Sequence, residues 1–202
     1  MGGDLSTLTD AELVALSQQG NLQAFNNLAD RWNGSLFRFT CRTLGNEDDA
    51  RDVVQEALLR AYQNIGRLRD PAKFKSWVHH IALNLCRDKF RSAAWRASVT
   101  PYEEEGEAGF RLSAAEVDSW AGDRAARQVG LSRVLQRALE TVPDEQRTAI
   151  LLREYQGFTS EEIGEITGVP AATVRTRIFY GLKTVRKTLQ SWGVSDAAIR
   201  RE

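Results

Sequence analysis

The chain has 202 residues, of which 42% are hydrophobic and 27% charged, and its 27 basic residues balance its 27 acidic ones. This composition is typical of a globular protein and argues against a binder that attracts nucleic acid through net charge alone. No apolar run approaches the ~20 residues that a membrane-spanning helix needs, and the N-terminus lacks the pattern of a signal peptide. We therefore expect a cytoplasmic protein built from two small domains.

Helical signals dominate the first part of the chain. Thr9 and Glu12 have the spacing of a capping box, and Gly20 is placed to end the helix that follows. From Leu22 to Leu44 the apolar residues recur at helical intervals, with expected breaks near Asn33-Gly34 and at Gly45.

Two further helices are expected in the first hundred residues. The first, from Asn46 to Ile65, opens with acidic residues that favour a helix N-terminus. The second runs from Lys73 to Arg91, and the Gly and Pro of "GRLRDPAKF" indicate a loop between the two. Aromatic residues here could be stacking platforms, but their helical spacing favours burial. The expected core residues of this helix are Phe74, Trp77, Ile81, Leu85 and Phe90.

The helical periodicity weakens from Ser92 to about Ala126, where Pro101 and the acidic run "YEEEGE" occur. This composition indicates a linker, with short helical turns around residues 114–120. Beyond it the chain is helical again, and Pro143 followed by acidic residues is typical of a first helical turn. No strand-like alternation of useful length occurs, so the sequence predicts an all-α protein.

A second capping box, Thr159 with Glu162, precedes a short helix that Gly168 is placed to end, and Pro170 suits the entry of the next helix. This pattern predicts a helix-turn-helix. On a helical projection, the core face of the second helix carries Val174, Ile178, Leu182, Val185 and Leu189. The opposite face carries Ala172, Thr173, Thr176, Tyr180, Lys183 and Lys187, flanked by Arg175, Arg177 and Phe179.

Basic residues gather in two stretches despite the zero net charge. Residues 171–188 hold five basic residues and no acidic one, and residues 60–91 hold eight basic residues opposed by Asp70 and Asp88. An exposed helix usually mixes both signs of charge. The pattern therefore favours a helix that enters a DNA groove over a solvated helix of an ordinary bundle.

The stretch "VPDEQRTAILLREYQGFTSEEIGEITGVPAATVRTRIFYGLKTVRKTL" resembles region 4 of the extracytoplasmic-function (ECF) sigma factors, the small two-domain initiation factors of bacterial RNA polymerase. In the other half, "DARDVVQEALLRAYQNI" resembles their region 2.2 and "FKSWVHHIALNLCRDKFR" resembles regions 2.3 and 2.4. The resemblance implies an all-α chain with region 2 at residues 1–95, an acidic flexible linker at 96–129 and region 4 at 130–202.

In that family, region 2.2 binds the clamp helices of the polymerase β′ subunit, while regions 2.3 and 2.4 capture an unstacked base of the −10 element. Base capture needs a shaped pocket with polar groups, and basic side chains follow the phosphates. The resemblance assigns polymerase binding to Asp49, Asp52, Gln55, Glu56 and Arg60. It assigns −10 contacts to Leu68, Arg69, Asp70, Lys73, Lys75, His80, Asn84, Arg87, Lys89 and Arg91.

Region 4 of the family reads the −35 element with its recognition helix. The matching positions here are Arg175, Thr176, Phe179 and Tyr180, with phosphate contacts expected from Arg153, Thr173 and Lys183. Tyr180 and Lys183 stand where many relatives carry Arg, which leaves the promoter preference open. The acidic residues of the linker would either mimic the charge of RNA or form a solubilising loop; they are Glu103, Glu104, Glu105 and Glu107.

Three classes of function remain to be weighed: a dissociable sigma factor, a stand-alone helix-turn-helix regulator with an N-terminal helical sensor domain, and an enzyme acting on nucleic acid. The block "DVVQE" and the basic stretch at 60–91 favour the first. No P-loop, metal-ligand spacing or catalytic triad supports the third, so we expect no catalytic residue, metal or cofactor.

The partners that the resemblance implies are the polymerase core, through the β′ clamp helices and β, promoter DNA and an anti-sigma factor. The two cysteines, Cys41 and Cys86, lie in no CxxC pattern and are expected to be reduced structural thiols, with a redox role left open.

Overall fold

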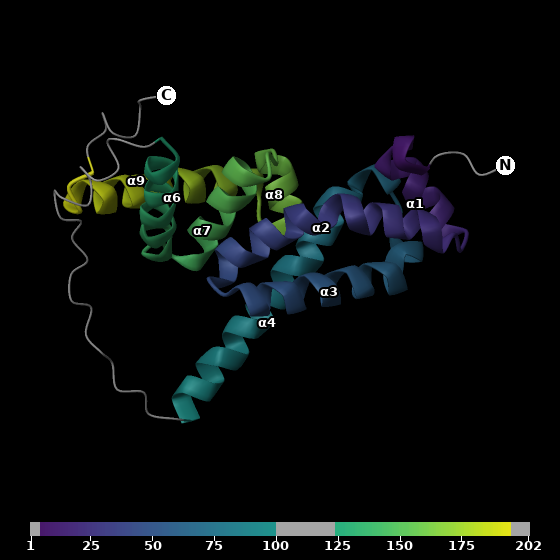
Figure 1. The fold of residues 1–202 in the computed structure, drawn as a ribbon, viewed down its shortest axis with the longest axis horizontal. Coiled ribbons are helices and arrows are strands. Elements are labelled where there is room, and N and C mark those ends of the chain that lie inside the picture. The colour runs from purple at the N-terminus through teal and green to yellow at the C-terminus, as the bar shows by residue number, and fades with distance from the viewer. Residues whose placement is uncertain (1–4, 100–123, 195–202) are drawn as a thin grey trace. The chain divides into compact units, whose positions relative to one another are not determined.

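The computed structural model describes residues 5–99 and 124–194. Within these ranges the regular secondary structure is helical throughout and contains no strand, which confirms the predicted all-α class (Figure 1). None of the described helices combines the length and apolar character that crossing a membrane requires. The chain divides into two compact units, one made of Met1–Pro101 with Leu151–Ala171 and the other of Tyr102–Ile150 with Ala172–Glu202.

The first unit contains most of the described helices, and in it α2 lies beside α3 and packs against α1 and α4 (Figure 1). Its helices are α1 (Asp10–Gln18), α2 (Leu22–Leu44), α3 (Glu47–Asn64), α4 (Phe74–Val99) and α8 (Ser160–Thr167), with 3₁₀ turns at Leu5–Thr7, Ile65–Arg67 and Pro71–Lys73 and a π-helical turn at Leu151–Tyr155. The helices of the second unit are α6 (Arg124–Glu140), α7 (Asp144–Ile150) and α9, which begins at the boundary and spans Ala171–Ser191.

The start of α8 and the turn after it follow the predicted capping chemistry. The Glu162 amide donates to the Thr159 hydroxyl at 3.2 Å, and the Thr159 amide donates to the Glu162 carboxylate at 2.7 Å. Gly168 ends the helix in the left-handed conformation, with φ of 75°. A Cβ atom on Gly164 would lie 2.7 Å from the backbone oxygen of Val169, so the tight turn requires glycine at this position of α8.

The predicted break in α2 at Asn33-Gly34 is wrong, because α2 continues without interruption from Leu22 to Leu44. Glycine inside a helix costs about 1 kcal/mol relative to alanine. Burial of Leu28 and Leu36 on either side of Gly34, both fully buried, stabilises the helix by more than that cost. The predicted stop at Gly45, by contrast, is confirmed, because this residue is the left-handed cap of α2.

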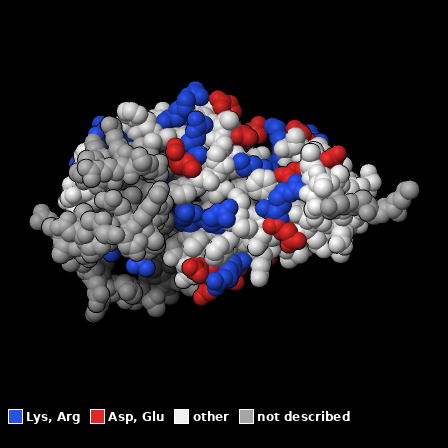
Figure 2. Space-filling model, turned by 45° about the horizontal axis from the view of Figure 1, so that its top comes forward, with Lys and Arg blue, Asp and Glu red and all other residues white. Residues whose placement is uncertain are grey.

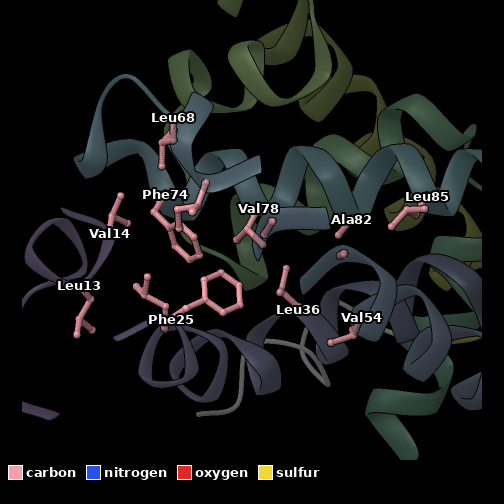
Figure 3. Packing of buried hydrophobic residues seen from close by; sticks show 14 of the residues in the cluster. Leu13, Val14, Phe25, Leu36, Val54, Leu68, Phe74, Val78, Ala82 and Leu85 are labelled. Atoms are coloured by element: carbon pink, nitrogen blue, oxygen red, sulfur yellow. The ribbon is translucent and has the colours of Figure 1, made fainter. Parts of the chain in front are cut away.

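The core of the first unit lies between α1, α2, α3 and α4. Figure 3 shows Leu68 and Phe74 close together at one end of the buried cluster, with Leu85 farther along α4. Phe74 is fully buried and Leu85 nearly so, while Trp77 and Ile81 pack against the cluster from its edge. These positions confirm that the aromatic residues at the start of α4 are core residues. Phe90, also predicted for the core, is half-buried.

In the second unit, α9 buries a face centred on a glycine. Val174, Val185 and Leu189 are buried as predicted. The prediction that Leu182 faces the core is wrong, because its side chain is 43% exposed. Gly181 takes the buried place, and a Cβ atom there would lie 2.7 Å from Cδ1 of Ile150 on α7. Because α7 approaches Gly181 closely, the buried face of α9 is shifted by one residue from the predicted one, and Leu182 lies at its edge.

Helical structure extends into both ends of the predicted linker, because α4 continues to Val99 and α6 begins at Arg124. The acidic run from Glu103 to Glu107 and the helical turns expected at 114–120 lie outside the described residues.

Candidate functional site

The residues predicted to bind polymerase lie on α3, away from its buried face. That helix buries Val53, Val54 and Ala57 in the core, and its N-terminus is capped by the Asn46 side chain, which accepts hydrogen bonds from two backbone amides. Farther along, Arg60 donates to the Glu56 carboxylate at 2.6 Å. The amphipathic pattern therefore turns the predicted polar residues toward solvent.

A groove of about 620 Å³ runs between α3 and α4. Its lining residues are Asp52, Val53, Gln55, Glu56, Leu59, Arg60, Leu85, Asp88, Lys89 and Ser92. Four of the five residues predicted for polymerase binding thus meet in one groove, together with residues of α4 that the prediction did not include. Leu59 was also missed, although an apolar residue that is half exposed on the polar face of an amphipathic helix is a signal that the sequence contains.

Lys89 faces α3 from its place on α4. Its ammonium group lies 2.6 Å from Oδ1 of Asp49 and 3.4 Å from Oδ2 of Asp52. The hydrogen bond to Asp49 raises the pKa of Lys89 above its usual value. Lys89, which was predicted to contact −10 DNA, is therefore paired with two residues that were predicted to bind polymerase.

The loop before α4 presents only some of its predicted −10 residues. Leu68 is 9% exposed and belongs to the hydrophobic core, so its side chain is unavailable and only its backbone can face a ligand. Arg69 and Asp70 are exposed, and the Asp70 carboxylate caps the following turn by accepting from the Ala72 amide at 3.0 Å. The loop is fixed to α1 by Gln18, whose amide donates to the carbonyl oxygens of Ile65 and Leu68 at 3.0 and 2.8 Å.

The predicted −10 residues nearest that loop contact the Leu151–Ala171 segment of the same unit. Lys73 forms an ion pair with Glu165 at 2.7 Å, which raises the pKa of Lys73. Lys75 donates to the Gln156 carbonyl oxygen at 2.8 Å. Nδ1 of His80 lies 2.7 Å from the Ile166 carbonyl oxygen.

The neighbouring predicted residues on α4 form a chain of polar contacts. The Asn84 side-chain nitrogen lies 2.9 Å from Nε2 of His80, and Arg87 donates to the Asn84 side-chain oxygen at 3.4 Å. Because Nδ1 of His80 faces a carbonyl oxygen, this nitrogen donates to it, and the other ring nitrogen faces the Asn84 amide. Arg87 and Arg91 are exposed, and Arg91 pairs with Asp88.

His79, by contrast, is a core residue that the sequence did not identify. It is fully buried among the rings of Trp32, Phe39 and Phe158, whose centroids lie 6.0, 5.7 and 5.0 Å from its own. Its Nδ1 donates to the Lys75 carbonyl oxygen at 2.8 Å. Burial lowers the pKa of His79 to about 4, so the ring is neutral near pH 7 and serves packing rather than charge.

The cysteines show no feature of a reactive thiol pair. Cys86 is buried, and burial raises the pKa of its thiol to about 12, so thiolate chemistry at this position is suppressed at neutral pH. Cys41 is half-buried on α2. The buried position of Cys86 supports the structural role that was expected for it.

The exposed face of α9 carries the predicted −35 residues. Arg175, Thr176, Phe179, Tyr180 and Lys183 are exposed, and Thr173 is half-buried. The rings of Phe179 and Tyr180 contact each other edge to face with centroids 5.3 Å apart, and Phe179 is 63% exposed. This face can offer hydrogen-bond donors to base edges and apolar surface to thymine methyl groups.

Two basic residues associated with the predicted −35 surface have structural partners. Arg177, on the flank of α9, pairs with Glu145 of α7 within the second unit. Arg153 lies in the π-helical turn of the first unit, where its guanidinium donates to the Phe158 carbonyl oxygen at 3.2 Å. Figure 2 shows basic and acidic side chains interspersed on the face in view, consistent with the balanced charge of the chain.

The sequence matches the family Sigma-70 region 2 over residues 28–96 and the family Sigma-70, region 4 over residues 132–185. It is similar to the ECF RNA polymerase sigma factor SigW of Bacillus subtilis, with 33% identity over 86% of this chain and 92% of that protein. It is also similar to the RNA polymerase sigma-H factor of Pseudomonas aeruginosa, with 28% identity over 90% of this chain and 94% of that protein. Among solved structures, CnrH in complex with the cytosolic domain of CnrY matches 90% of this chain and 97% of that chain, with 25% identity and a TM-score of 0.65.

Proposed function

The chain belongs to the ECF branch of the sigma-70 family, as a dissociable RNA polymerase sigma factor that directs transcription initiation, and we propose from this premise which of its surfaces carry each task. The domains that we propose are region 2 at residues 1–95, a linker at 96–129 and region 4 at 130–202. The observation that carries the proposal is the α3–α4 groove, which gathers Asp52, Gln55, Glu56 and Arg60 on one surface.

Core polymerase would bind at this groove. Val53, Leu59 and Leu85 supply apolar lining, and charged side chains surround them. An apolar centre with a polar rim is the usual anatomy of a protein interface. We assign the β′ clamp helices to this groove, with further contacts to β elsewhere, and we place the protein in the cytoplasm, where the polymerase and its promoters are.

The −10 element would be contacted by the loop before α4 and by α4 itself. Arg69 and Asp70 present exposed side chains at the loop, and Asn84 and Arg87 present polar groups from the helix. A base flipped from the stack is recognised by polar groups in a shaped pocket, and cations along the helix follow the strand. Lys73, Lys75 and His80 would join these contacts when DNA replaces their present partners in the first unit.

The −35 element would be read by the exposed face of α9. Small residues at its N-terminus, Ala171 and Ala172, allow the helix to approach a groove closely, as recognition helices do. Arg175, Thr176, Phe179 and Tyr180 would face the bases, with Thr173, Lys183 and Arg153 as phosphate contacts.

Replacement of Arg175 by alanine is expected to lower initiation from a promoter that depends on its −35 element by about 1–3 kcal/mol in apparent free energy, the usual loss for a base-reading arginine. The measurement is multi-round transcription with core polymerase on a panel of −35 variants. Lys187→Ala, which removes an exposed charge about three turns later on α9, serves as the matched control. An equal loss on every −35 sequence would make Arg175 a phosphate contact instead.

An anti-sigma factor is the partner proposed for regulation. The similar protein CnrH forms a complex with the cytosolic domain of CnrY, and a partner of this kind would block initiation by covering the groove between α3 and α4. Competition between such a partner and core polymerase for the same groove follows from the proposal.

A further inference from the structure

Lys89 occupies a different place from the other cations of α4. Its side chain is one-third exposed and lines the α3–α4 groove, whereas Arg87 and Arg91 of the same helix are exposed. Both partners of its ammonium group, Asp49 and Asp52, belong to α3. The structure therefore turns this cation toward the proposed polymerase surface.

The three charges form a compact arrangement that connects two helices. Asp49 and Asp52 are three positions apart on α3, so their carboxylates lie on the same side of the helix and repel each other. One ammonium group lies 2.6 Å from the Asp49 carboxylate and 3.4 Å from the Asp52 carboxylate, and its charge offsets that repulsion. An ammonium group has three donors, and Lys89 directs two of them to carboxylates of the proposed polymerase surface, which leaves one for a phosphate.

We propose that Lys89 is a positioning residue for the binding of core polymerase and not a contact to −10 DNA. It holds the Asp49 and Asp52 carboxylates in the orientation that the polymerase surface meets, and it keeps α4 against α3 along the groove. The inference rests on the proposed function of the groove. It moves Lys89 from the −10 DNA surface, where the resemblance placed it, to the polymerase surface.

Replacing Lys89 with methionine removes the charge while retaining most of the apolar stem. The Kd for core polymerase, measured with a fluorescent label on the full chain, is expected to rise about fivefold, the scale of a partly exposed ion-pair network. Lys89→Arg restores affinity, because guanidinium can bond to both carboxylates. Circular dichroism and thermal unfolding of each variant verify that the fold is kept.

A double-mutant cycle separates positioning from direct contact. In a chain that already carries Asp49→Asn and Asp52→Asn, Lys89→Met is expected to cause no further loss of core affinity. If Lys89 touches the polymerase itself, the loss persists in this background and the positioning role is overturned.

DNA binding provides the second readout. With core polymerase at saturating concentration, the holoenzyme containing Lys89→Met is expected to bind a forked −10 DNA as tightly as the wild type does, with the same salt dependence. The matched variant Arg87→Met should behave in the opposite way, with unchanged affinity for core and a salt slope reduced by about one.

Two results would overturn the inference: wild-type core affinity in Lys89→Met, or a reduced salt slope for its holoenzyme on forked DNA. Both are distinguishable from failure of the proposed function. In that case the chain that carries Asp49→Asn and Asp52→Asn would itself bind core polymerase as tightly as the wild type.

Discussion

Phe74→Ala is expected to lower the free energy of unfolding of the first unit by about 3–5 kcal/mol, the usual cost of truncating a buried phenylalanine. Phe74 is fully buried at the first turn of α4, and its ring centroid lies 6.1 Å from that of Trp77. Leu68, at the end of the preceding loop segment, belongs to the same buried cluster (Figure 3). The loss would therefore loosen the loop that carries Arg69 and Asp70.

Urea unfolding followed by circular dichroism measures this loss as a lower midpoint at an unchanged slope. Leu22→Ala is the matched control, since it also removes a large apolar side chain but from a position that is 54% exposed on α2. Its effect should stay within about 0.5 kcal/mol. Equal effects of the two substitutions would contradict the packing described for the start of α4.

Acid should destabilise the first unit through His79. The pKa of this histidine falls from its usual 6.5 to about 4 because burial disfavours the charged ring. Between pH 6.5 and pH 4, the unfolded chain therefore binds a proton at His79 and the folded chain does not. The associated stability is fully present above pH 6.5 and is lost as the pH falls toward 4, by about 3 kcal/mol in total.

His79→Phe isolates this contribution from the carboxylates that also titrate in acid. The variant keeps an aromatic ring among Trp32, Phe39 and Phe158 but cannot take up a proton. The unfolding free energy of the wild type minus that of the variant should fall between pH 7 and pH 4.5. A difference that is constant over this range would show that His79 titrates normally in the folded chain.

The sequence allowed the local structure to be predicted well where short-range chemistry decides it. The Thr9 and Thr159 capping boxes and the left-handed Gly168 depend on residues within a few positions of each other, so their pattern is visible in one helix at a time. The continuous α2 and the exposed Leu182 depend instead on a neighbouring helix. Burial around Gly34 and the approach of α7 to Gly181 override the local signals.

The same distinction applies to the candidate site. The resemblance to region 2.2 predicted a shared surface for Asp52, Gln55 and Glu56, and all three line the α3–α4 groove. The pattern of α4 could not indicate that Lys89 reaches across to Asp49, because this contact joins residues 40 positions apart. For Leu68, the resemblance predicted a contact to −10 DNA, while the structure buries its side chain.

The protein is expected to recognise a promoter when it is bound to core polymerase, and not as an isolated chain. The most direct test of this expectation is run-off transcription with purified core polymerase, with and without the protein, on templates that carry a −35 and a −10 element. We expect initiation at a defined site only when the protein is present, and weak binding of the isolated chain to duplex promoter. Tight, salt-resistant binding of duplex DNA by the chain alone, without initiation from any such template, would contradict the account and favour a stand-alone regulator.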